Sequence, residues 1–201
     1  PYTATILPTE GQAPEGTILQ SPDDGAMQCS ILSTWPDRSA AVVVVSGMVT
    51  VTAGQATSLR IQAATATAAT KLTAARIASL VTQVSVDFGS LGTASVSGFA
   101  SPERVWWANS QTICARYRAQ ASGHATLEAV VDIHAFADNR ALVEVVVENA
   151  KFDARNSTTS SVPAPASYTT ATLKVNGSDV ANVSGTGGAG GASRSTAPMS
   201  H

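Results

Sequence analysis

The sequence is poor in charged and aromatic side chains. Only 13% of its 201 residues are charged, and Phe, Trp and Tyr together supply 5%. An average globular protein carries about 25% charged residues. With 12 Lys and Arg against 14 Asp and Glu, the chain has no surplus of positive charge to neutralise a series of phosphates. We therefore expect no nucleic-acid partner.

Long apolar runs and a secretory signal are also missing. Nowhere do 18 consecutive apolar residues occur, so we expect no insertion into a membrane. The sequence begins at Pro1 with neither the charged segment nor the apolar segment of a signal peptide. These features predict a protein made and assembled in the cytoplasm.

Cysteine is scarce as well. The two cysteines, Cys29 and Cys114, lie in apolar, strand-like stretches, and a small secreted domain usually carries more disulfide bridges. Because free cysteines are among the most buried residues, we expect two buried thiols, with a disulfide as the alternative.

Alanine, serine and threonine are abundant, with 35, 23 and 23 copies, and apolar residues reach 44%. Short β-branched segments are separated by turn residues at intervals of about ten, which is typical of all-β proteins. The expected fold is an antiparallel barrel or sandwich of short strands with at most one short helix. That helix is expected from about Thr73 to Thr82, where Arg76, Ile77 and Leu80 are suitably spaced.

The clearest alternation runs from Thr126 to Ala137 and continues in Leu142–Asn149. A three-residue loop between these strands would pair Ile133 with Val145 and place His134 opposite Glu144. A shift of one residue would mix polar and apolar faces, so we expect this register. Asn139 or Arg140 would then adopt the left-handed backbone conformation.

Changes in composition divide the chain. We expect one main β-domain at residues 15–152, preceded by an N-terminal arm. A Ser/Thr/Pro-rich linker precedes a hairpin around Asn176-Gly177, and that hairpin would add to the domain or pair with a neighbouring subunit. The remaining segments are the arm at 1–14, the linker at 153–167, the hairpin at 168–184 and a flexible Gly/Ser-rich tail at 185–201.

One group of polar residues is a candidate acid–base or metal-binding site. Asp132 and His134 share a strand face, with Glu144 across from them, so the three side chains would form an acid–base or metal-binding cluster. The alternative is a solvated strand face with one cross-strand ion pair, and this is the interpretation we adopt.

Motifs for catalysis are absent. The sequence has no Gly-x-Ser-x-Gly, His-Glu-x-x-His or Cys-x-x-Cys motif, and its glycine-rich stretch at 185–191 precedes no helix with a lysine. We expect no catalytic residues, no resident metal and no cofactor, and hence a protein that is not an enzyme.

Aromatic and basic residues gather in one segment. Trp106, Trp107, Arg116, Tyr117 and Arg118 suggest a surface that binds a sugar or a protein. Adjacent residues of a strand face opposite ways, so we expect one tryptophan in the core and the other outside.

Three segments carry a family resemblance: ILSTWPDRSAAVVVVSG at 31–47, VWWANSQTICARYRAQ at 105–120 and VVDIHAFADNRALVEVVVENA at 130–150. Together they resemble the RIFT-barrel-like N-terminal β-domain of exo-rhamnogalacturonan lyase-like proteins. The same pattern is similar to domains in structural proteins of tailed phages and phage-like particles. The similarity spans about residues 27–152. Arg38 stands where that pattern usually has glycine, and the sequence does not include the long catalytic region that the lyases place downstream.

The resemblance implies a non-catalytic β-module. Our leading hypothesis is a bacteriophage virion structural component, such as a tail fibre, head spike or decoration protein. Its partners would be other virion proteins, copies of itself in a homo-oligomer and a host-surface polysaccharide. The alternative is the accessory carbohydrate-binding β-domain of a polysaccharide lyase-like enzyme, which would bind uronic-acid-containing glycans.

Overall fold

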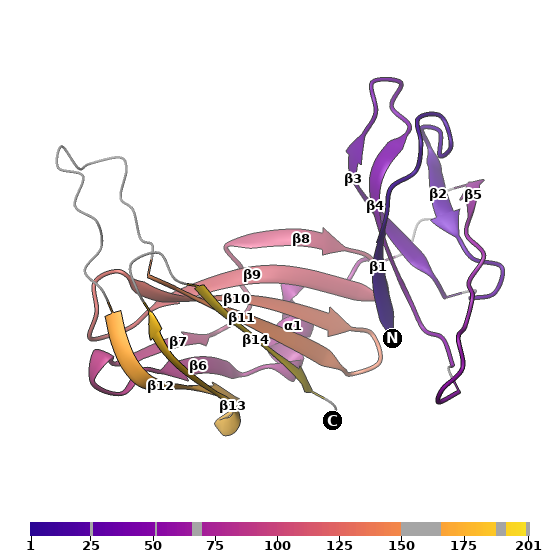
Figure 1. Cartoon of the computed structure of the whole chain (residues 1–201). Coiled ribbons are helices and arrows are strands. Elements are labelled where there is room, and N and C mark those ends of the chain that lie inside the picture. Colours follow the sequence, from indigo (N-terminus) through magenta and orange to yellow (C-terminus); the bar gives the residue numbers. More distant parts are fainter. Residues whose placement is uncertain (25, 51, 66–69, 150–165, 188–191, 200–201) are drawn as a thin grey trace. The chain divides into compact units, whose positions relative to one another are not determined.

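The computed structural model describes residues 1–24, 26–50, 52–65, 70–149, 166–187 and 192–199. Antiparallel strands dominate this part of the chain, and they are accompanied by one short α-helix (Figure 1). The all-β class expected from the sequence is confirmed. The chain forms two compact units.

The first unit contains Pro1–Thr73 together with two short returns of the chain, Trp107–Ile113 and Phe136–Asp138. It has a three-stranded sheet in the order β1-β4-β3 and a separate two-stranded sheet of β2 and β5. The bounds are β1 (Tyr2–Ile6), β2 (Thr17–Gln20), β3 (Gln28–Thr34), β4 (Ala40–Gly47) and β5 (Gln62–Thr65). Val43 and Val45 of β4 pack with Leu19 and Met27 to form its core.

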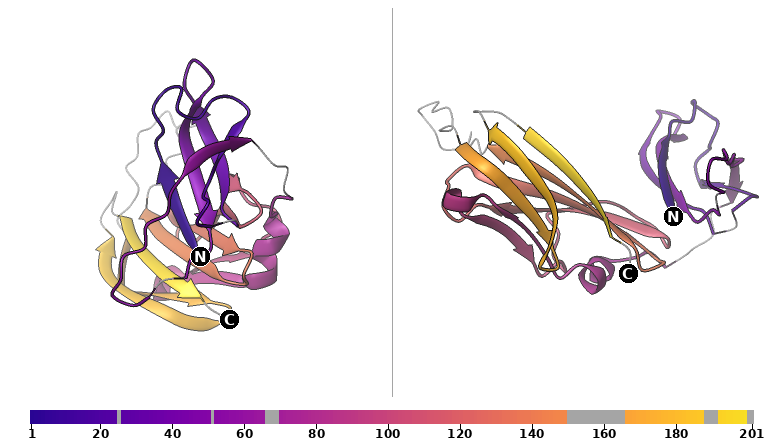
Figure 2. Two further views of the ribbon diagram at one scale, coloured as in Figure 1. Left: turned by 90° about the vertical axis from the view of Figure 1, so that its right-hand side faces the viewer. Right: turned by 60° about the horizontal axis from the view of Figure 1, so that its bottom comes forward.

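The second unit is a two-layered sandwich (Figures 1 and 2). One layer has the strand order β14-β11-β10-β9-β8, and the other has the order β13-β12-β6-β7. The strands of the first layer are β8 (Arg104–Ala108), β9 (Thr112–Gln120), β10 (Leu127–Phe136), β11 (Ala141–Asn149) and β14 (Ala192–Met199). Those of the second are β6 (Gln83–Asp87), β7 (Thr93–Ser97), β12 (Ala166–Val175) and β13 (Ser178–Gly187).

Two short helical segments complete the second unit. The helix α1 (Ala74–Leu80) lies within the range expected from the sequence and buries Ile77 and Leu80. A 3-10 turn, η1 (Gly89–Leu91), joins β6 to β7. The helix has only two turns, so its stability comes from this packing rather than from helix propensity.

Buried apolar residues alternate with more polar ones along the strands of the first layer, so one face of the layer forms the core and the other faces outward. The odd-numbered residues of β10 and β11, including Val131, Ile133, Val143 and Val145, are at most 7% exposed. The even-numbered positions carry most of the polar and charged side chains of these two strands. A strand pattern of period two thus gives the first layer a dry inner face and a polar outer face.

The pairing of β10 with β11 differs from the expected register by two residues. Ile133 pairs with Val143, and Asp132 rather than His134 lies opposite Glu144. A shift of two residues keeps every side chain on its own face, so apolar matching alone does not distinguish the two registers. Asn139 adopts a φ of 68°, as the turn argument anticipated.

Both ends of the chain differ from the expected division. Tyr2–Ile6, expected in an arm, form β1 and pair with β4. Ala192–Met199, expected in a flexible tail, form β14 and pair with β11. An edge strand is held by main-chain hydrogen bonds, so it needs little apolar sequence. The hairpin adds to the domain, because β12 pairs with β6; residues 153–165 of the expected linker lie outside the described residues.

Candidate functional site

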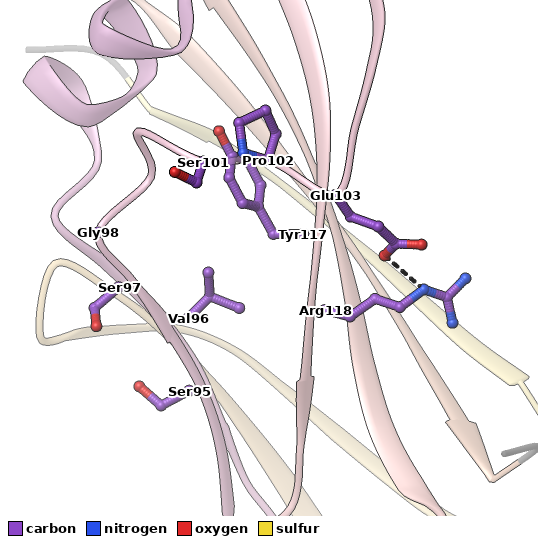
Figure 3. Close-up of a pocket in the computed structure, with 9 residues that line it drawn as sticks. All are labelled: Ser95, Val96, Ser97, Gly98, Ser101, Pro102, Glu103, Tyr117 and Arg118. Atoms are coloured by element: carbon purple, nitrogen blue, oxygen red, sulfur yellow. Dashed lines mark ion pairs between the residues drawn. The ribbon is translucent and has the colours of Figure 1, made fainter.

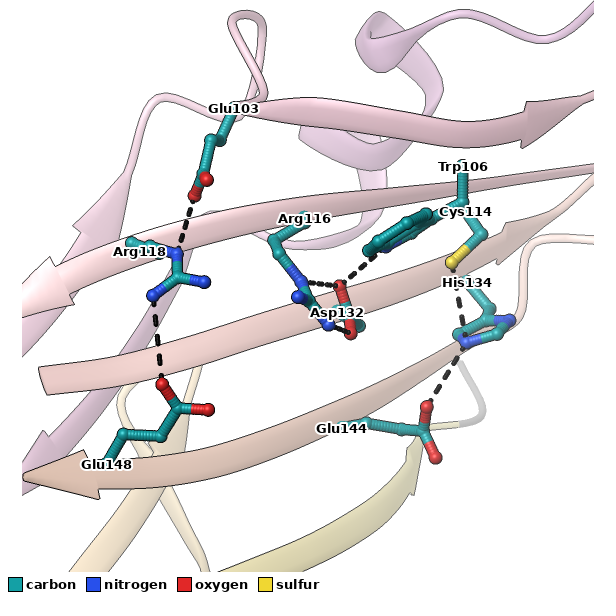
Figure 4. Close-up of polar contacts among 9 residues, drawn as sticks. All are labelled: Glu103, Trp106, Cys114, Arg116, Arg118, Asp132, His134, Glu144 and Glu148. Carbon is teal, nitrogen blue, oxygen red and sulfur yellow. Dashed lines mark hydrogen bonds and ion pairs between the residues drawn. The ribbon is translucent and has the colours of Figure 1, made fainter. Parts of the chain in front are cut away.

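The outer face of the five-stranded sheet carries a dense set of polar contacts (Figure 4). Most of these residues come from β8, β9, β10 and β11, where alternation brings the even-numbered positions to one side, and Glu103 lies directly before β8. Three separate groups form on this face, centred on Arg116, Arg118 and His134. All three contain residues singled out by the sequence.

The first group is a two-point ion pair. Arg116 Nε and Nη2 lie 2.9 and 2.6 Å from the two carboxylate oxygens of Asp132. Trp106 Nε1 donates a third hydrogen bond to Asp132 over 3.0 Å. Burial raises the pKa of Asp132, but the hydrogen bonds from Arg116 and Trp106 outweigh it and hold this pKa below its ordinary value.

The Trp106 ring is itself engaged by two cations. The guanidinium carbons of Arg104 and Arg116 lie 4.2 and 4.7 Å from its centroid. Such cation–π contacts fix the orientation of the ring. The π-surface proposed for sugar stacking is therefore already occupied by neighbouring side chains.

The second group surrounds Arg118 with carboxylates. Its Nε lies 2.9 Å from Glu103, and its Nη1 lies 2.7 Å from Glu128 and 3.8 Å from Glu148. One positive charge thus faces three negative ones. This excess of carboxylate makes the local field negative.

The third group joins Cys114, His134 and Glu144. His134 Nε2 lies 3.5 Å from Cys114 Sγ and 3.4 Å from Glu144 Oε2. In a nucleophile–histidine–acid relay the imidazole uses its two nitrogens for the two partners, whereas here both contacts fall on Nε2. Burial, reinforced by Asp132 and Glu144, raises the pKa of the Cys114 thiol well above its ordinary value. This thiol is therefore not an activated nucleophile.

The polar cluster suggested by the sequence therefore divides in two. Asp132 belongs to the Arg116 ion pair, whereas His134 and Glu144 contact each other on the diagonal of the sheet. In the described parts of the chain, no three His, Cys, Asp or Glu side chains are arranged to hold a metal ion. The His134–Glu144 contact crosses between two strands, as in the interpretation adopted in the sequence analysis, but the same face also carries the ion pairs of Arg116 and Arg118.

Two residues of the expected binding surface lie elsewhere. Tyr117 is only 4% exposed, and its hydroxyl donates to the Phe99 carbonyl over 2.8 Å, so it is a core residue and not a surface contact. Trp107 follows Trp106 on β8 and has its side chain on the other side of that strand, half-buried. Trp106, Arg116 and Arg118 share one face, as the surface requires.

A second feature of this unit is a polar hollow of about 500 Å³ (Figure 3). Three serines and Val96 stand on one side of Tyr117, and the Glu103–Arg118 ion pair stands on the other. Sequence reasoning singled out Arg118 and Tyr117 but missed the serines. The lining residues are Ser95, Val96, Ser97, Gly98, Ser101, Pro102, Glu103, Tyr117 and Arg118.

Both cysteines are free thiols, Cys114 buried and Cys29 half-buried.

Within the described ranges, no helix is long and apolar enough to cross a membrane.

The fold and these contacts define a protein with an antiparallel β-sandwich and a heavily paired polar face. Comparisons of the chain with protein-family models, curated proteins and solved structures give no match.

Proposed function

We propose that the protein is a virion structural component of the tail-fibre, head-spike or decoration type. It works by protein–protein assembly, with copies of itself and with other virion proteins, and it presents a surface for host glycans. The role is one of binding and not of catalysis.

The exposed apolar edge of the first unit is the observation that carries this proposal. β3 is the outer strand of its sheet, and its Ile31 and Leu32 are 44% and 45% exposed. Trp35 is the first residue after β3 and is 40% exposed. Its Nε1 donates a hydrogen bond to the carbonyl of Pro8, and Leu7, the preceding residue, is exposed as well. Exposed apolar edge strands are templates for pairing with another chain.

The polar face supports a binding role in a different way. Its cations are already held by carboxylates and by Trp106, and burial raises the pKa of its Cys114 thiol above the ordinary value. Stable pairs of this kind stiffen a sheet, and they leave no activated group among the side chains described above. A rigid scaffold suits a particle component that works by contact.

The test is the solution mass of the full chain at micromolar concentration, measured by light scattering. We expect a defined oligomer that Leu32→Lys converts to the 20.4 kDa monomer, because a lysine on an edge strand blocks pairing. Val180→Lys is the matched control, since Val180 is 40% exposed on β13. A wild-type protein that stays monomeric, or an oligomer that survives Leu32→Lys, would contradict assembly through β3.

A further inference from the structure

The turn between β12 and β13 contains a chemically labile pair of residues. Asn176-Gly177 is the one Asn-Gly pair in the sequence. It joins Val175 to Ser178, which pair directly across the hairpin, and its two residues have φ values of 50° and 82°. Two positive φ values are typical of a two-residue turn of type I′, which favours asparagine followed by glycine. Both turn residues are exposed.

An Asn-Gly pair is able to deamidate without an enzyme. The main-chain nitrogen of the glycine forms a bond to the asparagine Cγ, the Cγ–Nδ2 bond breaks, and ammonia leaves with the proton of the attacking amide. Water then opens the resulting succinimide at one of its two carbonyls, which gives aspartate or isoaspartate. Glycine favours the attack because it has no side chain beside the nitrogen. Gly177 is also uncrowded, since none of the described atoms lies within 4 Å of the position that a Cβ would take.

The folded chain restrains the Asn176 side chain. Its Nδ2 donates to the Leu80 carbonyl over 3.1 Å, and its Oδ1 accepts from the Thr82 amide over 2.8 Å and from the Thr82 hydroxyl over 3.0 Å. The Gln83 amide donates to the same oxygen over 3.4 Å. Ring closure needs the Cγ carbonyl to turn its face to the Gly177 nitrogen at close range. The hydrogen bonds to the end of α1 oppose such a rotation, so they protect the asparagine.

Deamidation removes the donor that this contact needs. Aspartate has two acceptor oxygens and no N–H group, so it offers the Leu80 carbonyl only another acceptor. Its negative charge also lies at the C-terminal end of α1, where the helix dipole disfavours it. In isoaspartate the main chain passes through Cγ, which adds one atom to the turn between Val175 and Ser178. Neither product is able to restore the original contact.

We propose that Asn176-Gly177 is a deamidation site that acts as a one-way switch. While the turn is bound to the end of α1, the asparagine is protected; when this contact opens, the asparagine reacts with water as the only co-reactant, and the modified turn does not close again. The change loosens the end of the sheet where Val175 of β12 pairs with Val84 of β6. All of these residues belong to the second unit, so the inference does not rest on the proposed assembly through β3.

The test compares the deamidation rate of the folded full chain with that of the chain unfolded in guanidinium chloride, in the same mildly alkaline buffer. Peptide mapping by mass spectrometry quantifies asparagine, aspartate and isoaspartate at residue 176. We expect the folded chain to react at least about tenfold more slowly, because the reaction then waits for local opening. Asn182 is the internal control and should stay asparagine in both samples, since the branched side chain of Val183 hinders attack.

Thr82→Ala tests whether the hydrogen bonds cause the protection. The variant removes one donor to Asn176 Oδ1 and leaves the Asn-Gly pair itself unchanged. We expect several-fold faster deamidation of the folded chain and an unchanged rate in guanidinium chloride. Thr170→Ala, at an exposed threonine on β12, is the matched control and should keep both rates of the wild type.

Asn176→Asp tests the one-way character, because it introduces one of the two products directly. We expect this variant to unfold at a lower concentration of denaturant than the wild type. Asn182→Asp, at an exposed asparagine on β13, adds the same charge and should keep the wild-type midpoint.

Any of four results would overturn the proposal. Equal rates in the folded and unfolded chains would show that the contact does not protect Asn176, and an unreactive Asn176 in guanidinium chloride would show that the pair is not labile. A folded Thr82→Ala chain that reacts no faster than Thr170→Ala would assign the protection to another cause. An Asn176→Asp chain as stable as Asn182→Asp would show that the modification leaves the contact intact.

Discussion

Asp132 accepts hydrogen bonds from both Arg116 and Trp106, so one carboxylate joins β8, β9 and β10 on the outer face of the sheet. The two ionic side chains are only 17% and 27% exposed. A pair in this setting contributes more than a solvated surface pair, because water screens it less. Removal of either side chain of this ion pair also leaves the charge of the other one largely buried and without its partner.

Replacing this carboxylate should therefore lower stability in a pH-dependent way. We expect Asp132→Asn to reduce the free energy of unfolding by about 2 kcal/mol at pH 7. The pKa of Asp132 is depressed in the folded protein, so its contribution is present above the unfolded pKa of about 4 and is lost as pH falls through the folded value. Urea unfolding of both proteins between neutral and acidic pH checks this.

Glu10→Gln, at an exposed carboxylate, provides the control for the loss of one negative charge. An Asp132→Asn protein as stable as wild type at neutral pH would show that the ion pair contributes nothing net. A deficit that persists unchanged in acid would show that packing, and not charge, is responsible.

Asn176 links the β12–β13 turn to the end of the helix. Its Nδ2 donates to the Leu80 carbonyl, the last residue of α1, over 3.1 Å, and its Oδ1 accepts from the Thr82 amide over 2.8 Å. It also has a φ of 50°, which asparagine tolerates better than alanine does. We expect Asn176→Ala to destabilise the protein by roughly 2 kcal/mol.

Amide hydrogen exchange locates the effect of Asn176→Ala. Protection should fall at Thr82 and Gln83, whose amides face the asparagine oxygen. Asn182→Ala, at an exposed asparagine on β13, should leave these amides protected. Equal loss of protection in both variants would show that the hydrogen bonds of the Asn176 side chain are not the cause.

Gly47 ends β4 where there is no room for a side chain. A Cβ there would collide with the Asp24 carboxylate and would come within 2.7 Å of the Tyr2 hydroxyl. These two groups are hydrogen-bonded over 3.0 Å, and Asp24 also accepts from the Met48 amide. We expect Gly47→Ala to cost about 2–4 kcal/mol of stability, measured by thermal and urea unfolding.

Gly54→Ala distinguishes a steric cause from a conformational one. Gly54 has a φ of 75°, and none of the described atoms lies within 4 Å of the Cβ it would gain. Its replacement should therefore show only the backbone strain, about 1 kcal/mol. If both alanine variants lose the same stability, the crowding at Gly47 is not the cause.

Arg38 holds a backbone conformation that suits glycine. Its φ is 66°, in the turn between β3 and β4, and its ion pair with Glu15 is exposed on both sides. We expect Arg38→Gly to stabilise the protein by up to about 1 kcal/mol, since relief of strain exceeds the loss of a surface ion pair. Arg38→Ala keeps the strain, so it should give no gain; equal stability of the two variants would contradict this account.

The sequence alone predicted features that depend on local patterns. Alternation put Ile133 and Val145 on one face of their strands, which the structure buries, and Asn176-Gly177 formed the expected turn. The left-handed Asn139 followed from the short connection. Each of these depends on neighbours in sequence, where side-chain period and turn chemistry decide the outcome.

Other features were decided only by the tertiary structure. The pairing of Asp132 with Glu144 differs by two residues from the expected register, because a shift of two leaves every face unchanged. β1 and β14 joined sheets through main-chain hydrogen bonds, which a weak apolar pattern does not reveal. The polar hollow brings Ser97 and Ser101 together with Arg118 from a different sheet, and only the packing of the two layers creates such a neighbourhood. Composition and period thus determined the class of fold and its core, while strand partners and the candidate site depended on contacts between residues distant in sequence.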